Sequence, residues 1–280
     1  MLEIRNVNVV YDPNTIFRKE ALTNVSLQIS SGESIAIIGK IGSGKSTLIQ
    51  LFNGLVKPDE GEVLLDGVDI NTKNVSRKEI IRKVGIVFQY PEEQFFAETV
   101  FEEVAFGPRN LDFSQKEIKE CVYDALRVMG FDPPSIIHRT PFSLSGGEKR
   151  RVAIASVIAM RPEILILDEP TAGMDYAGKT SVISHIREGR TGGLTTAFVT
   201  HDMEEAFYLA NRIIALDSGF IVFDGSPEEF FSNRNLISQI GLEAPFVLRF
   251  REKLLDCLGE IPFSKNLETL VDLIGAMIGH

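Results

Sequence analysis

The sequence predicts an α/β fold in which helices cover a mainly parallel sheet. Short apolar runs at residues 34–38, 164–168 and 195–202 alternate with stretches of helical periodicity, which is typical of parallel strands joined by helical crossovers. The segment GKIGSGKST (39–47) directly follows the first run, where a loop between a buried strand and a helix is expected. Together these observations indicate a fold that binds an anion at the end of a strand.

Two regions add to this core. The N-terminal segment is rich in strand signals and predicts an antiparallel β region, whereas about residues 90–160 turn helical and predict an inserted helical subdomain. The segment RIIALDSGFIVFDG (212–225) predicts a hairpin that turns at Ser218-Gly219. Further strand-like runs lie at residues 2–11, 24–30, 61–67 and 83–89.

Length and composition allow one large or two modest domains, because the chain has 280 residues, of which 44% are hydrophobic. The formal net charge of −10 argues against broad electrostatic binding to nucleic acid. The start lacks the basic and apolar regions of a signal peptide, and the longest apolar stretch (152–160) is too short for a transmembrane helix. Cys121 and Cys257 lack metal-ligand spacing and are expected to be reduced thiols.

Residues 39–47 contain the full phosphate-loop pattern of a P-loop NTPase core. The glycines let backbone N–H groups turn toward an anion, because a Cβ would crowd the phosphates, and the following helix N-terminus adds a favourable field. Lys45 can reach the outer phosphates of ATP, and the Ser46 hydroxyl can ligate Mg²⁺. We therefore expect the whole loop to contact the nucleotide: Gly39, Lys40, Ile41, Gly42, Ser43, Gly44, Lys45, Ser46 and Thr47.

A second acidic motif, ILILDEP, occupies residues 164–170. Asp168 ends an apolar strand, and Glu169 follows at once. In P-loop folds such an aspartate holds Mg²⁺, directly or through water, and the neighbouring carboxylate polarises the attacking water. Alone the pattern would be weak, since buried strands often end in polar residues, but with the loop at 39–47 it indicates a metal ligand and a catalytic base.

A third motif, FSLSGGEKRRVAIA (142–155), predicts a helix that opens at Ser145-Gly146-Gly147. Such a helix start exposes N–H groups and forms a second anion site, although Ser145 could also serve as a plain N-cap. Two phosphate-facing surfaces in one chain are explained most simply if one binds the chain's own nucleotide. The other would then close on the nucleotide of a partner chain.

Along residues 1–230 the chain resembles an ATP-binding-cassette (ABC) ATPase. LSGGE (144–148) is similar to the signature motif of that family, TAGMD (171–175) to its D-loop, and the segment around His201 to its switch-histidine segment. The resemblance implies ATP and Mg²⁺ as cofactors. Nucleotide contacts would come from Tyr11, Ser145, Gly146, Gly147, Glu148 and Asp175, metal ligands from Ser46, Gln89 and Asp168, and catalytic groups from Glu169, His201, Gln89 and Lys45. For Tyr11, Gln89 and His201 the alternative is a packing or strand-end role.

Residues 89–110 narrow the resemblance to the ATPases of energy-coupling-factor (ECF) and cobalt-type importers. This resemblance implies ATP hydrolysis that powers uptake of a vitamin or transition-metal ion. The implied partners are a second ABC ATPase subunit (identical or related), a membrane-embedded coupling subunit and a substrate-binding membrane subunit. The chain would then lie on the cytoplasmic face of the cell membrane as a peripheral protein. The rival hypothesis, a soluble ABC ATPase acting on DNA or ribosomes, is disfavoured by the acidic charge and the single cassette.

The same resemblance predicts extra C-terminal helices, so we divide the chain into an ATPase domain (1–230) and a helical extension (231–280). Near the end of the extension, one helical stripe fits either an intrachain core or a dimerisation surface. The stripe consists of Leu267, Leu270, Val271, Ile274, Met277 and Ile278.

Residues 90–108 are predicted to dock the membrane-embedded subunit, because phenylalanines and carboxylates gather there directly after Gln89. These residues are Phe95, Phe96, Phe101 and Phe106, with Glu92, Glu93, Glu98, Glu102 and Glu103. The chain departs from the wider family at two positions. Glu148 stands where glutamine is usual, and Met174 replaces a common leucine. Neither departure removes a catalytic group.

Overall fold

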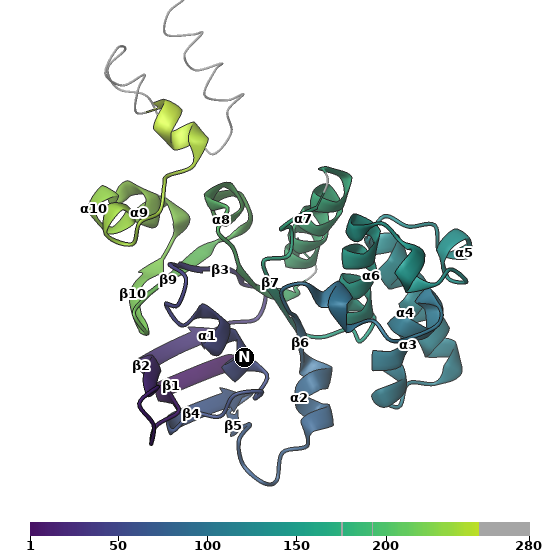
Figure 1. Cartoon of the computed structure of the whole chain (residues 1–280), viewed down its shortest axis with the longest axis horizontal. Helices are drawn as coiled ribbons and strands as arrows, with labels where there is room; N and C mark the ends of the chain where they lie inside the picture. The colour runs from purple at the N-terminus through teal and green to yellow at the C-terminus, as the bar shows by residue number, and fades with distance from the viewer. Residues whose placement is uncertain (175, 192, 252–280) are drawn as a thin grey trace, which may run out of the picture.

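The computed structural model describes residues 1–174, 176–191 and 193–251, and a six-stranded sheet lies at its centre (Figure 1). The strand order is β10-β9-β3-β8-β7-β6, with bounds Phe220–Gly225, Arg212–Asp217, Ser34–Gly39, Thr195–Val199, Ile164–Asp168 and Val84–Val87. All neighbours pair in parallel except β10, which pairs antiparallel with β9. The prediction of a mainly parallel sheet is therefore confirmed.

A second, antiparallel sheet has the order β2-β1-β4-β5. Its strands are Lys19–Ile29, Leu2–Tyr11, Glu60–Leu65 and Val68–Asp69. The predicted N-terminal antiparallel region is thus confirmed, and it continues past the first two strands to residue 69. The predicted hairpin is also present, since Ser218 and Gly219 have φ angles of 51° and 85° between β9 and β10.

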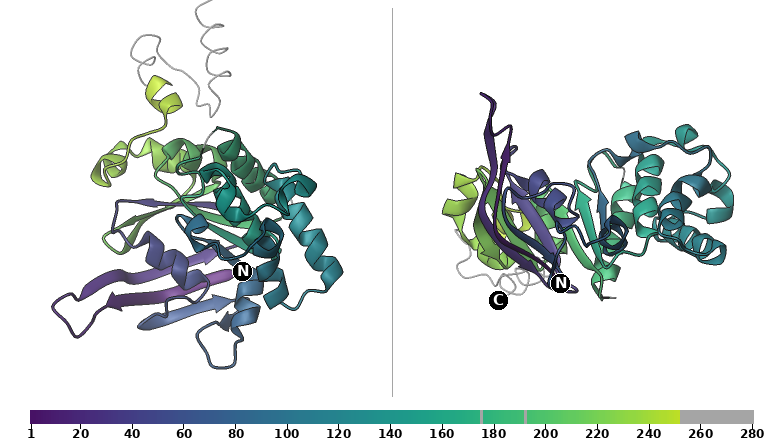
Figure 2. Two further views of the ribbon diagram at one scale, coloured as in Figure 1. Left: turned by 45° about the vertical axis from the view of Figure 1, so that its right-hand side comes forward. Right: turned by 90° about the horizontal axis from the view of Figure 1, so that it is seen from below.

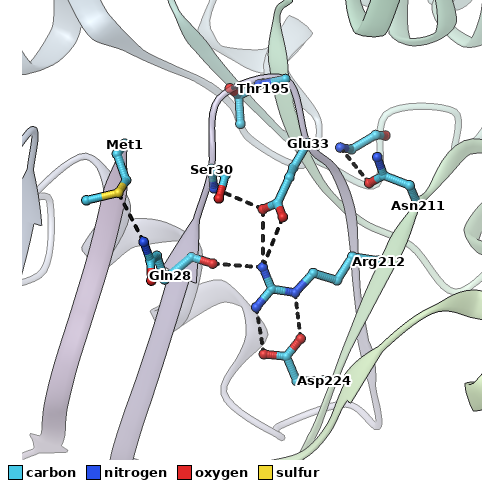
Figure 3. A network of polar contacts seen from close by, with 10 residues as sticks. Met1, Gln28, Ser30, Glu33, Thr195, Asn211, Arg212 and Asp224 are labelled. Atoms are coloured by element: carbon cyan, nitrogen blue, oxygen red, sulfur yellow. Dashed lines mark hydrogen bonds and ion pairs between the residues drawn. The ribbon is translucent and has the colours of Figure 1, made fainter.

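Arg212, the first residue of β9, joins the two sheets (Figure 3). Its guanidinium donates to both carboxylate oxygens of Asp224 (2.6 and 2.8 Å) and to the backbone carbonyl of Gln28 near the end of β2 (2.8 Å). It also lies 3.2 Å from Glu33, just before β3. These bonds fix the sheets at the amino ends of β3 and β9, opposite the edge where the phosphate loop follows β3.

The central sheet is buried on both faces because its residues alternate between two apolar clusters. On β3, Ala36 and Ile38 pack in the cluster that contains the helical residues of α3, α4 and α6. Ile35 and Ile37 pack in the other cluster, with residues of β1, β2, β4 and helix α1 (Lys45–Phe52). A strand with apolar residues on both faces appears in the sequence as a continuous apolar run. For this reason the run at residues 34–38 was sufficient to predict β3.

The helices after β6 form a lobe beside the sheets (Figure 2). Their bounds are Pro91–Gln94 (η1), Val100–Asn110 (α3), Gln115–Val128 (α4), Pro133–Ile136 (α5), Pro141–Ser143 (η2) and Gly146–Ile158 (α6). Within this segment α3 and α4 are separate helices, because Ser114 starts α4 by accepting the backbone N–H of Glu117. The helical character of 90–160 is confirmed, whereas the domain boundaries stay predictions.

The remaining helices are Arg77–Lys83 (α2), Tyr176–Thr191 (α7), Met203–Leu209 (α8), Pro227–Ser232 (α9) and Arg234–Gln239 (α10). The start of the C-terminal extension packs back on the ATPase core, because Phe231, Ile237 and Ile240 are buried in the same apolar cluster as α6. The stripe predicted between Leu267 and Ile278 lies outside the described residues. In the described part of the chain, no helix combines the length and apolarity needed to cross a bilayer.

Candidate active site

The predicted site residues meet at one edge of the central sheet. The carboxyl ends of β3, β8, β7 and β6 are neighbours, and the segments that leave them carry the phosphate loop, His201, Asp168-Glu169 and Gln89. Gln89 lies two residues beyond the end of β6. The parallel topology therefore converts four motifs that are far apart in sequence into one site.

The phosphate loop has the shape of an anion cradle. At Gly39 and Gly44, with φ of 149° and 106°, an added Cβ would lie 2.3 Å from the Leu216 carbonyl oxygen and 2.5 Å from that of Ala21. At Gly42 a Cβ would meet no atom within 4 Å. Ser43 is buried, and its hydroxyl oxygen has no hydrogen-bond partner in the described chain. Two glycines thus allow close packing behind the loop, while an open glycine and an unpaired buried hydroxyl fit a phosphate-bearing ligand.

Lys45 lies inside the loop. Its Nζ donates to the backbone carbonyls of Gly39 (2.8 Å) and Lys40 (2.9 Å). Burial lowers the pKa of Lys45, and the charges of Glu169 and Asp168 partly oppose that shift. An ammonium group partly removed from water and held by neutral carbonyls is ready to bind an anion.

The other loop residues have different surroundings. The Tyr11 hydroxyl lies 3.3 Å from Thr47 Oγ1, so the half-exposed Tyr11 ring stands beside the start of α1. Lys40 instead donates its Nζ to the Gln239 carbonyl at the end of α10 (3.0 Å). Ile41 is almost fully exposed. The structure therefore places Tyr11 beside the loop, but it turns the Lys40 side chain toward the C-terminal extension.

Glu169 is bonded on both carboxylate oxygens. His201 Nε2 lies 2.8 Å from Oε1, and Gln89 Nε2 donates to Oε2 at 3.2 Å. Glu169 has a left-handed backbone, with φ of 50°, and its N–H donates to the Val199 carbonyl (3.0 Å). Because Gln89 uses its amide nitrogen here, its amide oxygen is free of this contact and can face a cation.

Asp168 is buried directly before Glu169. Burial raises its pKa, the charge of Glu169 raises it further, and Lys45 and His201 act in the opposite sense. Two adjacent carboxylates at a buried edge are stabilised by a cation. A divalent metal with oxygen ligands from Asp168, Ser46 and Gln89 fits this donor set.

The third motif forms a helix start in the helical lobe. Ser145 is the N-cap of α6, and it makes a reciprocal capping box with Glu148: the Ser145 N–H donates to Glu148 Oε2 (2.8 Å), and the Glu148 N–H donates to Ser145 Oγ (3.3 Å). An added Cβ at Gly146 would meet nothing within 4 Å. The N-cap role of Ser145 is thus present, and the free glycine surface beside it is available to a ligand. Asp175 lies outside the described residues.

Sequence reasoning missed two buried charged residues at this edge, Arg150 and Glu205. Arg150 donates to the backbone carbonyls of Glu169 (2.5 Å) and Pro170 (3.3 Å). Glu205 on α8 accepts hydrogen bonds from Thr171 and from Thr200 (2.8 Å), and it lies 3.0 Å from Lys179 Nζ. A charged residue within an apolar helix stripe was the available signal, because such a residue needs buried partners.

Beside Gln89 the lobe contains an apolar groove of about 580 Å³. It is lined by Ile81 of α2, by residues 86–88 at the end of β6, and by phenylalanines of the predicted docking segment. Phe96 and Phe106 are 61% and 47% exposed and pack edge to face, with ring centroids 4.7 Å apart. Phe95 and Phe101, in contrast, pack partly buried against the apolar core.

The carboxylates of the same segment also divide into two groups. Glu103 is buried and accepts the backbone N–H groups of Phe96 (3.1 Å) and Ala97 (2.9 Å), and Glu102 pairs with Arg109. Glu93 and Glu98 are exposed and form no ion pair within the described residues. Of the five carboxylates predicted to meet the membrane-embedded subunit, Glu93 and Glu98 are therefore the two that are exposed and unpaired within the described residues.

Comparison with known proteins agrees with this geometry. Residues 22–172 match the family described as ABC transporter. The chain is 45% identical to the energy-coupling factor transporter ATP-binding protein EcfA2 of Clostridium tetani, over 88% of this chain and 86% of that protein. It is 43% identical to the protein of the same name from Clostridium perfringens, over 98% of both.

Solved structures show the same architecture. CbiO1 from Clostridium perfringens, described as part of the ABC transporter complex CbiONQ, has a TM-score of 0.74 at 34% identity and covers 90% of this chain and 98% of its own. The ATP-binding cassette MJ0796, solved as a dimer in a post-hydrolysis state with ADP and Pi, has a TM-score of 0.72 at 30% identity. It covers 81% of this chain and 99% of its own. The chain therefore belongs to the ABC transporter family, in the group of energy-coupling factor transporter ATP-binding proteins. Membership makes it a nucleotide-binding ATPase whose hydrolysis is coupled to transport.

Proposed function

We propose that this chain is the ATP-hydrolysing subunit of an ECF-type importer, bound to the cytoplasmic face of the membrane through separate membrane subunits. Its task would be to power the uptake of a vitamin or a transition-metal ion. One observation carries the proposal: Phe88 lines the apolar groove, and the next residue, Gln89, is bonded to Glu169. A protein bound in the groove would therefore touch the segment that reaches the catalytic carboxylate.

In this proposal each side chain at the sheet edge has one role. Tyr11 stacks on adenine, and Lys45 with the loop N–H groups binds the phosphates. Ser46, Gln89 and Asp168 hold Mg²⁺, which supplies charge neutralisation at the phosphates. Glu169 accepts a proton from the attacking water, and His201, which is within reach of the same carboxylate, steadies the γ-phosphate.

A second copy of the cassette would complete the site. The Ser145-Gly146-Gly147 start belongs to α6 in the helical lobe, whereas the phosphate loop leads into α1 beside the sheets (Figures 1 and 2). We infer that Ser145, Gly146 and Gly147 bind the γ-phosphate held by the partner's loop, with Glu148 and Asp175 at the same interface. The partner is a second ABC ATPase, either identical or related.

The proposed occupant of the groove is an apolar helix face of the membrane-embedded subunit. Phe96 and Phe106 would contact that face, and Glu93 and Glu98 would meet basic residues on the cytoplasmic side of the membrane protein. This arrangement excludes Glu92 from the contact, because Glu92 lies 3.7 Å from Arg150 inside the lobe. Charge reversal is therefore better tested at Glu93 and Glu98 than at Glu92.

The test is co-purification of the full chain with its membrane complex. Glu93→Lys combined with Glu98→Lys, and separately Phe96→Ala, should lower the recovered complex by about tenfold, equivalent to roughly 1.4 kcal/mol. ATP binding by the isolated chain should not change. Glu120→Lys, on an exposed position of α4 outside the groove, is the matched control. Wild-type recovery of both the double charge-reversal variant and Phe96→Ala would contradict docking in the groove. Co-sedimentation of the chain with ribosomes or DNA would favour the soluble alternative, which the similar proteins do not favour.

A further inference from the structure

Arg150 lies between the two segments that carry the catalytic groups. It stands on α6, is 3% exposed, and its guanidinium makes separate contacts in two directions. Toward β7 it donates to the carbonyls of Glu169 (2.5 Å) and Pro170 (3.3 Å). Toward the docking segment it lies 3.7 Å from Glu92 Oε1 and 5.7 Å from the centre of the Tyr90 ring.

The contacts with β7 act on a strained backbone. Glu169 has φ of 50°, a conformation that non-glycine residues adopt rarely and at an energetic cost. Its N–H is held by the Val199 carbonyl (3.0 Å) and its carbonyl by Arg150. Because the peptide groups on both sides of Glu169 are fixed, the direction of its carboxylate toward Gln89 and His201 is fixed as well.

The contacts of Arg150 with the docking segment involve Tyr90 and Glu92, which lie directly after Gln89. Tyr90 also has a left-handed backbone, with φ of 53°, and Glu92 follows in the 3-10 helix η1. Glu92 Oε2 is buried and has no hydrogen-bond partner among the described residues. The carboxylate of Glu92 thus depends on Arg150, and a movement of η1 changes the charge environment of the same guanidinium that holds Glu169.

We propose that Arg150 is a positioning residue for Glu169 and that it links Glu169 to the docking segment through Glu92. The link is separate from the side-chain contact between Gln89 and Glu169, because it acts on the backbone of Glu169. The planar guanidinium suits this role, since three separate nitrogens in a fixed fork each meet a different group: Nε the Pro170 carbonyl, Nη2 the Glu169 carbonyl and Nη1 the Glu92 carboxylate. The inference rests on the proposed role of Glu169 in hydrolysis.

The experiment measures kcat, KM and the dissociation constant of Mg-ATP for the assembled transporter that carries Arg150→Gln or Arg150→Lys. Arg150→Gln should lower kcat about 10²-fold, the cost of misplacing a catalytic group by roughly 1 Å, while KM and ATP binding stay within about threefold. Arg150→Lys should recover part of kcat, because it keeps the charge near Glu92 but has one nitrogen where Arg150 uses three nitrogens at separate positions. Glu92→Gln should keep the basal kcat of the isolated chain and lower the stimulation of ATP hydrolysis by the membrane complex.

Arg151→Gln is the matched control. Arg151 is the next residue of α6 and donates to the Met129 carbonyl (2.9 Å) within the lobe, so its loss should lower the melting temperature without a selective fall in kcat. Wild-type kcat in Arg150→Gln would overturn the positioning role, and wild-type stimulation in Glu92→Gln would overturn the link. Parallel losses of ATP affinity and kcat in the Arg150 and Arg151 variants would reduce Arg150 to a structural residue. Hydrolysis by Glu169→Gln at the wild-type rate would instead count against the proposed function. If Arg150→Gln does not fold, the kcat of Arg150→Lys and the stimulation of Glu92→Gln decide the question.

Discussion

The two helix starts that we propose as phosphate-binding sites are built in opposite ways. Helix α1 begins after Gly44, which has a left-handed backbone and offers no side-chain cap, and its first turn contains no acidic residue. Helix α6 begins after Ser145, which caps it, and its first turn contains Glu148. The first start leaves its N–H groups for a ligand, whereas the second satisfies part of its own.

This difference predicts that the two helix starts bind an anion with different strength. The loop before α1 has a buried lysine and an unpaired buried serine hydroxyl, so it can bind an anion without a partner. The start of α6 already accommodates one carboxylate, and the Glu148 pKa is lowered by the hydrogen bond from the Ser145 backbone and side chain. A helix start that already holds an anion binds a second one weakly, so α6 should contribute only when the partner's nucleotide is brought to it. Four predictions test this comparison.

The largest effect is expected for Glu169→Gln. The amide keeps the shape of the side chain and its contacts with Gln89 and His201, but it cannot accept a proton from water. Turnover should fall about 10³-fold while ATP binding is kept, and the ATP-bound dimer should accumulate because one negative charge leaves the interface. Steady-state hydrolysis and size-exclusion chromatography with ATP measure the two effects. Near-normal hydrolysis in the assembled transporter would show that Glu169 is not the base.

Lys45→Ala tests whether the start of α1 binds the nucleotide without a partner chain. Removal of the buried ammonium that borders the phosphates should weaken Mg-ATP binding about 10²-fold, since charge-assisted hydrogen bonds contribute roughly 1.5–3 kcal/mol each. Lys57→Ala, an exposed lysine shortly after α1, is the charge-matched control. Equilibrium binding of a fluorescent ATP analogue provides the measurement. An unchanged affinity in a folded Lys45→Ala protein would contradict the assignment of the loop.

Local patterns in the sequence were sufficient to predict both helix starts. The strands β3, β7 and β8 were recognisable because buried parallel strands are largely continuous apolar runs, and α6 because a helical stretch opens at Ser145-Gly146-Gly147. Local patterns could not predict which side chains bond to each other when their residues are far apart in the sequence. That Arg150 holds the Glu169 carbonyl, or that Glu103 turns inward while Glu98 does not, depends on how the lobe packs against β7. Such contacts are decided by tertiary structure, so composition suggested five docking carboxylates where the structure leaves two exposed and unpaired.

A complementation experiment tests whether α6 acts on the partner's nucleotide. A homodimer of Ser145→Arg and a homodimer of Lys45→Ala should both be inactive. A mixed dimer should regain one intact site, formed by the loop of the first chain and the α6 start of the second, and so about half of the wild-type activity. If the partner is a related ATPase, each substitution should instead damage a different site of the heterodimer. Full activity of a strictly monomeric chain at high dilution would contradict both versions.

The smallest effect concerns the carboxylate that α6 places at its own start. Glu148→Gln keeps an acceptor for the Ser145 N–H but removes the charge near the helix N-terminus, where a carboxylate typically contributes 0.3–1 kcal/mol. Glu117→Gln is a matched control, because Glu117 forms the same capping box with Ser114 on α4. Both substitutions should lower the melting temperature by on the order of 2 °C. Only Glu148→Gln should strengthen ATP-driven dimerisation, by roughly threefold, because only Glu148 would lie beside the partner's phosphate.

The pH dependence of this effect follows from the sign of the shift. The folded pKa of Glu148 is lowered, so its contribution to stability is present above its ordinary pKa and is lost as the pH falls through the lowered value. The difference in melting temperature between the wild type and Glu148→Gln should therefore be largest at neutral pH and disappear as the pH falls through the lowered pKa of Glu148. Calorimetry of both proteins from pH 7 downward measures it. A difference that persists at acidic pH would show that the carboxylate's charge does not stabilise α6, and an equal gain in dimerisation by Glu117→Gln would remove Glu148 from the interface.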